Sequence, residues 1–184
     1  MVDPVDGSHN ALSDIPSATV SLALGRERLS DLRVGVVHDL FLGRTHWALR
    51  GQGAYLDGVR MSTRTWRSGQ ELLMVNLGAN ATPRAHRAAA SVRRVRALGC
   101  ASLEMALVAQ GASDGYFSDN EPGERNLRVT DMAAGYLLVR EAGGGVYAPG
   151  SGPLDLPLDL KNRTPLLAWG DPRFLEQGRQ EGRW

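Results

Sequence analysis

The sequence of 184 residues contains a single cysteine, Cys100, and a single lysine, Lys161. One thiol excludes an intrachain disulfide and a thiolate metal cluster, and such sparing use of cysteine favours the cytoplasm. No apolar run approaches the ~18 residues that a membrane-spanning helix needs, and the first residues show no secretory signal. The formal net charge is only +1, so no charge excess indicates binding to nucleic acid or to a membrane surface.

What the sequence does contain is typical of a globular protein. Hydrophobic residues make up 42% and charged residues 22%, which predicts one domain over residues 1–184 with a substantial core. In the first half, residues 17–24, 32–42 and 45–50 read as strands, and the glycine-rich residues 51–61 read as a tight turn plus one short strand. The first half is therefore predicted to be an antiparallel meander.

The second half alternates strands with helices, which predicts layered α/β structure. Thr82-Pro83 and Asp171-Pro172 are expected helix starts, because a capping side chain precedes a proline at the first helical position. The other expected elements are strands at 71–78, 95–99, 114–117, 144–148 and 164–170, and helices at 101–111 and 130–142.

The opening residues place two acids, Asp3 and Asp6, on either side of Pro4. Two ionised carboxylates this close repel each other unless a cation lies between them, and hard ions such as Mg²⁺ prefer such oxygen ligands. Gly7 and Ser8 can then begin a helix whose free N–H groups attract a phosphate. The alternative is an Asx turn that caps the helix, with both acids in solvent.

A second candidate cluster begins with Thr130 and Asp131, at the start of the predicted helix 130–142. An acid at a helix start is favoured by the helix dipole, so a capping role is the simpler interpretation. The small residues 133–135 follow, however, and they permit close approach of another backbone or of a ligand. A third carboxylate here would complete an oxygen-rich metal site with Asp3 and Asp6.

These residues carry a resemblance to a known family. "DPVDGSHN" (3–10) resembles the Asp-Pro-Ile-Asp-Gly-Thr-x-Asn signature of the inositol monophosphatase family, and "TDMAAGYLLVREAGG" (130–144) resembles its second signature. Between the two signatures, residues 35–61 are similar to the family's strand hairpin and glycine-containing turn, and residues 97–117 to its Gly-Ser-Ala-Ala helix and the strand after it. The resemblance covers nearly the whole chain and is strongest to archaeal members, which often act on both inositol phosphates and fructose 1,6-bisphosphate. It implies an α/β fold, a layered αβαβα sandwich.

The resemblance implies a Mg²⁺-dependent phosphatase and assigns metal ligands. Asp3, Asp6 and Asp131 would bind two Mg²⁺ ions with their side chains, and Val5 would offer its backbone carbonyl. A metal-bound water would attack a phosphate monoester in line, with the ions stabilising the attacking and leaving oxygens. The ligand would be a small phosphorylated metabolite, and homodimers are common in the family.

The resemblance also implies roles around the phosphate. The N–H groups of Gly7 and Ser8 would bind it, and the Ser8 hydroxyl would orient the water, so that Ser8 joins Asp3 and Asp6 as a catalytic residue. Gly99 and Ala101 would line the substrate pocket.

A charged loop before the second signature supplies further candidates for substrate contact, Glu124, Arg125 and Arg128. An arginine there can pair with a second phosphate, whereas the alternative for all three residues is a solvated loop.

Relative to the family pattern, the sequence has no counterpart of the upstream segment that carries a metal-bridging Glu-Glu motif. We therefore expect an N-terminally incomplete domain without its outermost helices, with apolar surface left uncovered. Alternatives to the sugar or inositol phosphatase are a 3′-phosphoadenosine phosphate or NADP phosphatase of the same family, and a non-catalytic interaction protein.

Overall fold

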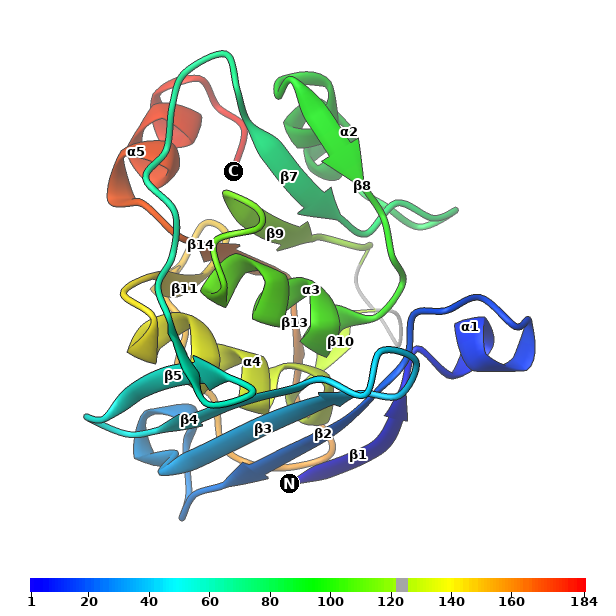
Figure 1. The fold of residues 1–184 in the computed structure, drawn as a ribbon. Coiled ribbons are helices and arrows are strands. Elements are labelled where there is room, and N and C mark those ends of the chain that lie inside the picture. Colours follow the sequence, from blue (N-terminus) through cyan, green and yellow to red (C-terminus); the bar gives the residue numbers. More distant parts are fainter. Residues whose placement is uncertain (122–125) are drawn as a thin grey trace.

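A computed structural model describes residues 1–121 and 126–184 of the chain. Two six-stranded sheets and two layers of helices stack in the order helices, sheet, helices, sheet (Figure 1). The predicted α/β sandwich is therefore confirmed. In residues 1–121 and 126–184, none of the helices combines the length and the apolar character that spanning a membrane requires.

The first sheet is the antiparallel meander that the sequence predicts. Its strands follow one another in chain order, and each pairs with the next. They are β1 (Val2–Asp6), β2 (Thr19–Leu24), β3 (Val34–Asp39), β4 (Thr45–Leu49), β5 (Gly53–Leu56) and β6 (Val59–Met61).

The prediction for residues 51–61 was wrong in one respect, because the segment forms a hairpin of two strands. Asp57 and Gly58 join β5 to β6 with φ values of 48° and 85°. Two consecutive residues with positive φ are characteristic of the type I′ turn that matches strand twist in two-residue hairpins.

The second sheet is mixed. Strand β7 runs parallel to both β8 and β9, and the remaining pairs are antiparallel. In spatial order the strands are β12 (Gly152–Pro153), β11 (Gly145–Ala148), β14 (Leu166–Trp169), β9 (Gly115–Ser118), β7 (Leu72–Val75) and β8 (Arg94–Arg96). A separate two-stranded ladder joins β10 (Leu127–Arg128) to β13 (Arg163–Thr164).

The helices divide between the layers. α3 (Ala101–Ala109) and α4 (Val129–Glu141) lie between the two sheets, and α2 (Pro83–Ala90) and α5 (Pro172–Gln180) cover the other side of the second sheet (Figure 1). The short α1 (Ser8–Leu12) projects from the end of β1, and a 3₁₀ turn spans Leu29–Asp31. Thr82 and Asp171 cap α2 and α5 as predicted, accepting hydrogen bonds from Ala85 and Arg173 respectively.

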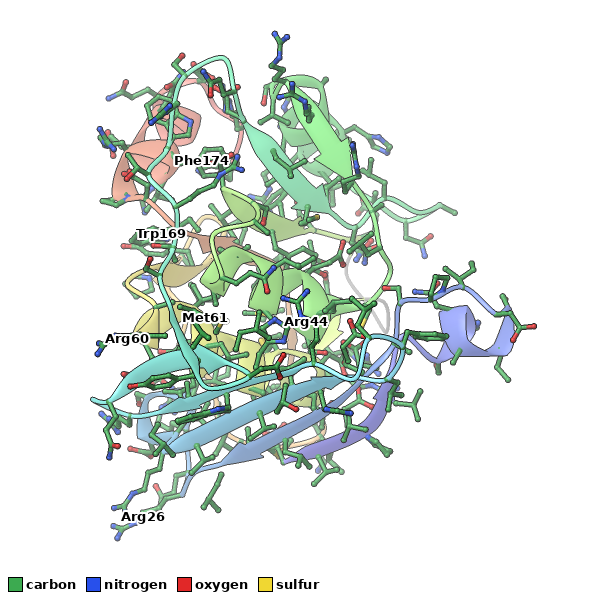
Figure 2. The ribbon with its side chains drawn as sticks, in the orientation of Figure 1. Arg26, Arg44, Arg60, Met61, Trp169 and Phe174 are labelled. Carbon is green, nitrogen blue, oxygen red and sulfur yellow. The ribbon has the colours of Figure 1, made fainter. Side chains whose placement is uncertain are left out.

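Two apolar clusters hold the layers together. One lies between the sheets around α3 and α4 and includes Met61, and the other includes Phe174 and lies against α2 and α5; Figure 2 shows both side chains. α3 and α4 are apolar on nearly all sides, as expected of fully buried helices.

The small residues of α4 serve backbone packing. A Cβ on Gly135 would lie 2.6 Å from the Cβ of Met105 on α3, and one on Gly35 of β3 would lie 2.9 Å from the carbonyl oxygen of Ala134. Ala133 and Ala134 are themselves fully buried. Of the two interpretations of this stretch, the close approach of other main-chain segments is the one that the packing supports.

The outer face of the first sheet exposes apolar side chains, as the resemblance led us to expect. Leu22 and Leu24 on β2 are 41% and 62% exposed, and Val2 on β1 is 57% exposed. Among the described residues no helix covers this face in Figure 1.

Candidate active site

The first predicted acids lie on an irregular edge strand. β1 pairs with β2 through Val2–Leu22, Asp3–Ser21 and Asp6–Thr19, and the register shifts between Asp3 and Asp6. Residues three apart in a regular strand point to opposite faces. The shift includes Pro4, which has no N–H to donate to the ladder. Because of the shift, the carboxylates of Asp3 and Asp6 are not forced onto opposite faces of the sheet.

A tight turn follows β1 and sets the start of α1. Gly7 has φ of 80°, and a Cβ there would lie 2.6 Å from the carbonyl oxygen of Ser17. Only glycine meets both conditions without strain. Asn10 fixes the turn to a distant loop, because its side-chain amide donates to the carbonyls of Ser17 at 2.9 Å and Leu98 at 2.6 Å.

The carboxylate of Asp6 faces the beginning of α3. Its Oδ2 accepts hydrogen bonds from the backbone N–H of Ser102 at 2.7 Å and from the Ser102 hydroxyl at 2.6 Å. The Cys100 thiol lies 3.4 Å from the same oxygen. Asp6 thus satisfies one of the N–H groups that a helix start leaves unpaired, at the end where the dipole favours negative charge.

Burial and charge act on both groups. Burial raises the pKa of Asp6, and the hydrogen bonds from Ser102 and Cys100 offset this in part. Burial, followed by the negative charge of Asp6, raises the pKa of Cys100 to about 12. At neutral pH the sulfur therefore stays a neutral thiol and can donate to the carboxylate.

Asp131 lies in the first turn of α4, and its capping role is confirmed. Its Oδ2 accepts the backbone N–H of Arg128 at 3.0 Å, and its Oδ1 accepts the hydroxyl of Thr130 at 2.9 Å.

Asp131 also reaches the first cluster. Burial raises the pKa of Asp3, the negative charge of Asp6 raises it further, and the negative charge of Asp131 also contributes. The structure therefore brings together three acids that are separated by up to 128 positions in the chain.

The chemistry of this donor set fits a hard divalent cation. The three side chains supply carboxylate oxygens, which Mg²⁺ and Ca²⁺ prefer. Among the described residues, no Lys, Arg or His forms an ion pair with any of them. Across residues 1–121 and 126–184, however, no group of three or more His, Cys, Asp or Glu side chains is already gathered closely enough to hold a metal ion. The acids are neighbours, and a cation would have to draw them closer.

The remaining predicted residues are placed as follows. Ser8 is exposed at the start of α1, and Gly99 is exposed with φ of 70° beside Asn10. Ala101 is buried at the start of α3. Val5 is exposed, and its N–H donates to Asp3 Oδ1 at 3.1 Å.

The charged loop is only partly described. Arg128 is exposed at the N-terminus of α4. Glu124 and Arg125 lie outside the described residues, so their predicted roles stay predictions.

Sequence reasoning missed Ser102 and Thr19, which support Asp6 from α3 and β2. Neither belongs to an acidic or glycine-rich motif. The sequence signal nearest to them is the run of small residues at 99–102, of which only Gly99 and Ala101 were predicted to have a role, as pocket lining.

The cavity of about 330 Å³ at Arg64, Arg67 and Asp114 lies elsewhere, and none of the three acids lines it. Arg64 forms a two-pronged ion pair with the buried Asp114, whose Oδ2 also accepts the Leu72 N–H at 2.8 Å. These contacts close a structural network around Asp114.

Comparison with known proteins places the chain by its sequence and fold. The model of the inositol monophosphatase family matches residues 1–178. A fructose-1,6-bisphosphatase/inositol-1-monophosphatase of Methanothermobacter thermautotrophicus is 36% identical over 188 residues, covering 96% of this chain and 65% of that protein. A bifunctional NADP phosphatase/NAD kinase of Methanococcus maripaludis is 31% identical over 188 residues, covering 91% of this chain and 32% of that protein.

A solved structure extends the comparison to the fold. A hypothetical protein of Pyrococcus horikoshii, described as having similarities to inositol-1 monophosphatase, superposes with a TM-score of 0.82 at 28% identity, covering 95% of this chain and 66% of that one. The chain thus spans about two thirds of the length of two of these relatives and about one third of the other. Proteins of the matched family are generally metal-dependent. On the family match and the shared fold, the chain belongs to the inositol monophosphatase family.

Proposed function

We propose that this chain carries the catalytic centre of a metal-dependent phosphomonoesterase that acts on a small sugar or inositol phosphate. The observation that carries the proposal is the convergence of Asp3, Asp6 and Asp131 beside the Gly7–Ser8 turn and the start of α3. Family membership supports the reaction class, because relatives at 36% and 34% identity are named as phosphatases.

We assign the metal as Mg²⁺, held by the carboxylates of Asp3, Asp6 and Asp131 with the carbonyl of Val5. When bound, a divalent ion of this kind lowers the pKa of water and neutralises phosphate charge. Asp6 Oδ2 is committed to Ser102 and Cys100, so Asp6 would offer its other oxygen to the cation.

The phosphate would lie against the backbone N–H groups of Gly7 and Ser8, with the Ser8 hydroxyl orienting the attacking water. Support comes from the positive φ of Gly7 and the exposure of Ser8. Gly99 and Ala101 would border the leaving group, where short side chains leave room for it. Exposed Arg128 is the described candidate for contacting further anionic groups of the substrate.

A second substrate candidate is the 2′- or 3′-phosphate of a nucleotide. It is favoured by one observation, the similarity to two archaeal proteins named bifunctional NADP phosphatase/NAD kinase. A non-catalytic interaction protein is the remaining alternative, supported by the uncovered apolar face of the first sheet.

The deciding experiment measures phosphate release with and without Mg²⁺ from inositol 1-phosphate, fructose 1,6-bisphosphate, NADP and 3′-phosphoadenosine 5′-phosphate. We expect Mg²⁺-dependent release from at least one of them. Asp131→Asn should abolish it, because the amide keeps the cap but loses the charge. Glu27→Gln, which changes an exposed acid, is the matched control. Equal turnover by wild type and Asp131→Asn would refute the proposal, and no release from any substrate would favour the interaction protein.

A further inference from the structure

A pair of buried hydroxyls stands behind Asp6. Thr19 on β2 and Ser102 in the first turn of α3 are both fully buried, and their side-chain oxygens lie 2.6 Å apart. Thr19 is also the residue directly opposite Asp6 in the β1–β2 ladder. Two elements that are distant in sequence therefore meet at one carboxylate.

The direction of these hydrogen bonds follows from proton counting. An ionised carboxylate only accepts, so the single hydroxyl proton of Ser102 is given to Asp6 Oδ2 at 2.6 Å. The Ser102 oxygen is then left to accept, and the Thr19 hydroxyl donates to it. The result is a directed chain from Thr19 through Ser102 to Asp6.

This series of hydrogen bonds engages one carboxylate oxygen of Asp6 and leaves the other available. Oδ2 receives the Ser102 N–H, the Ser102 hydroxyl and the nearby Cys100 thiol. Within the described residues, no donor contacts Oδ1. Hydrogen bonds to a charged acceptor are among the stronger ones in proteins, so this arrangement fixes the orientation of the free oxygen.

We propose that Ser102, itself held by Thr19, is a positioning residue that orients Asp6 so that its free oxygen points to the cation. The proposal rests on the function proposed above and extends it to residues outside the acidic motifs. Ser102 touches neither substrate nor metal in this account and acts only through Asp6.

The test compares Mg²⁺ dissociation constants, measured by titration calorimetry, of wild type and four variants. Ser102→Ala and Thr19→Val each interrupt the hydrogen-bond series from Thr19 to Asp6. We expect Mg²⁺ binding about 10–100-fold weaker in both, the range typical for residues that orient a metal ligand. Thr19→Ser keeps the hydroxyl and should bind within about twofold of wild type. Ser113→Ala removes another fully buried hydroxyl, one without a hydrogen-bond partner in the described structure, and should leave binding unchanged.

A second readout separates failure of this proposal from failure of the proposed function. In metal-free protein, carboxyl ¹³C NMR should report a higher pKa for Asp6 in Ser102→Ala than in wild type, because donors to the charged form are lost. Wild-type Mg²⁺ affinity in Ser102→Ala, or an unchanged Asp6 pKa, would overturn the positioning role. A wild type that binds no Mg²⁺, together with a shifted Asp6 pKa, would refute the proposed function while retaining the role of Ser102 in holding Asp6.

Discussion

Gly7→Ala is expected to be strongly destabilising because two costs combine at that position. An L-residue pays about 1–2 kcal/mol to adopt the left-handed conformation that φ of 80° requires. The new methyl group would also lie 2.6 Å from the Ser17 carbonyl oxygen and 3.2 Å from the Cys100 Cβ. Overpacking of this kind adds about 1–3 kcal/mol, so the free energy of unfolding should fall by about 2–5 kcal/mol.

Gly43→Ala is the matched control, because Gly43 has φ of 65° and no atom within 4 Å of the added Cβ. Gly43→Ala incurs only the cost of the left-handed backbone conformation. That cost is partly offset because alanine lowers the conformational entropy of the unfolded chain. Thermal unfolding should show a loss of about 4–20 °C for Gly7→Ala, at about 2–4 °C per kcal/mol for a chain of this size. Gly43→Ala should lose less than half as much. Equal losses for the two variants would show that the close approach of residues 7, 17 and 100 is wrong.

Three further results are expected. Burial raises the pKa of Glu104 from its ordinary 4.5 to about 7. At about 1.4 kcal/mol per pH unit, the free energy of unfolding of wild type should fall by up to about 3 kcal/mol relative to Glu104→Gln as the pH rises from 4.5 through 7. Denaturant unfolding checks this, and parallel pH profiles for the two proteins would contradict it. Arg64→Ala leaves the carboxylate of Asp114, which is 2% exposed, without its partner and should lower the free energy of unfolding by about 3 kcal/mol. The exposed Arg67 is the control, and Arg67→Ala should change it by no more than about 0.5 kcal/mol. Similar melting temperatures for the two variants would count against the buried ion pair. The predicted homodimer should give twice the 19.9 kDa chain mass in light scattering, and the monomer mass at micromolar concentration would remove that prediction.

The elements that the sequence predicted well are those with strong local signals. Thr82-Pro83 and Asp171-Pro172 begin helices because capping and proline geometry act within four residues. The alternation in residues 17–24 and 45–50 marks strands with one buried face, which β2 and β4 have. The hairpin at Asp57-Gly58 was missed because the surrounding glycines obscured the short strands on either side.

Only the acidic residues of the candidate site could be predicted from the sequence, and the residues that support them could not. The acids at 3, 6 and 131 stand in recognisable signatures, whereas Ser102 and Thr19 act on Asp6 only because the β1–β2 register and the start of α3 bring them there. Such contacts depend on tertiary packing, and no local pattern encodes them. The α4 residues Ala134 and Gly135 illustrate the same limit, since their small size serves contacts with β3 and α3.

Calorimetric titration of Mg²⁺ into wild type, Asp3→Asn and Asp131→Asn tests whether acids from the two signatures share a cation. These two acids lie on different elements, β1 and α4. If they share a cation, wild type binds Mg²⁺ and each substitution weakens binding by at least about tenfold. Binding by Asp131→Asn that equals wild type would contradict the account.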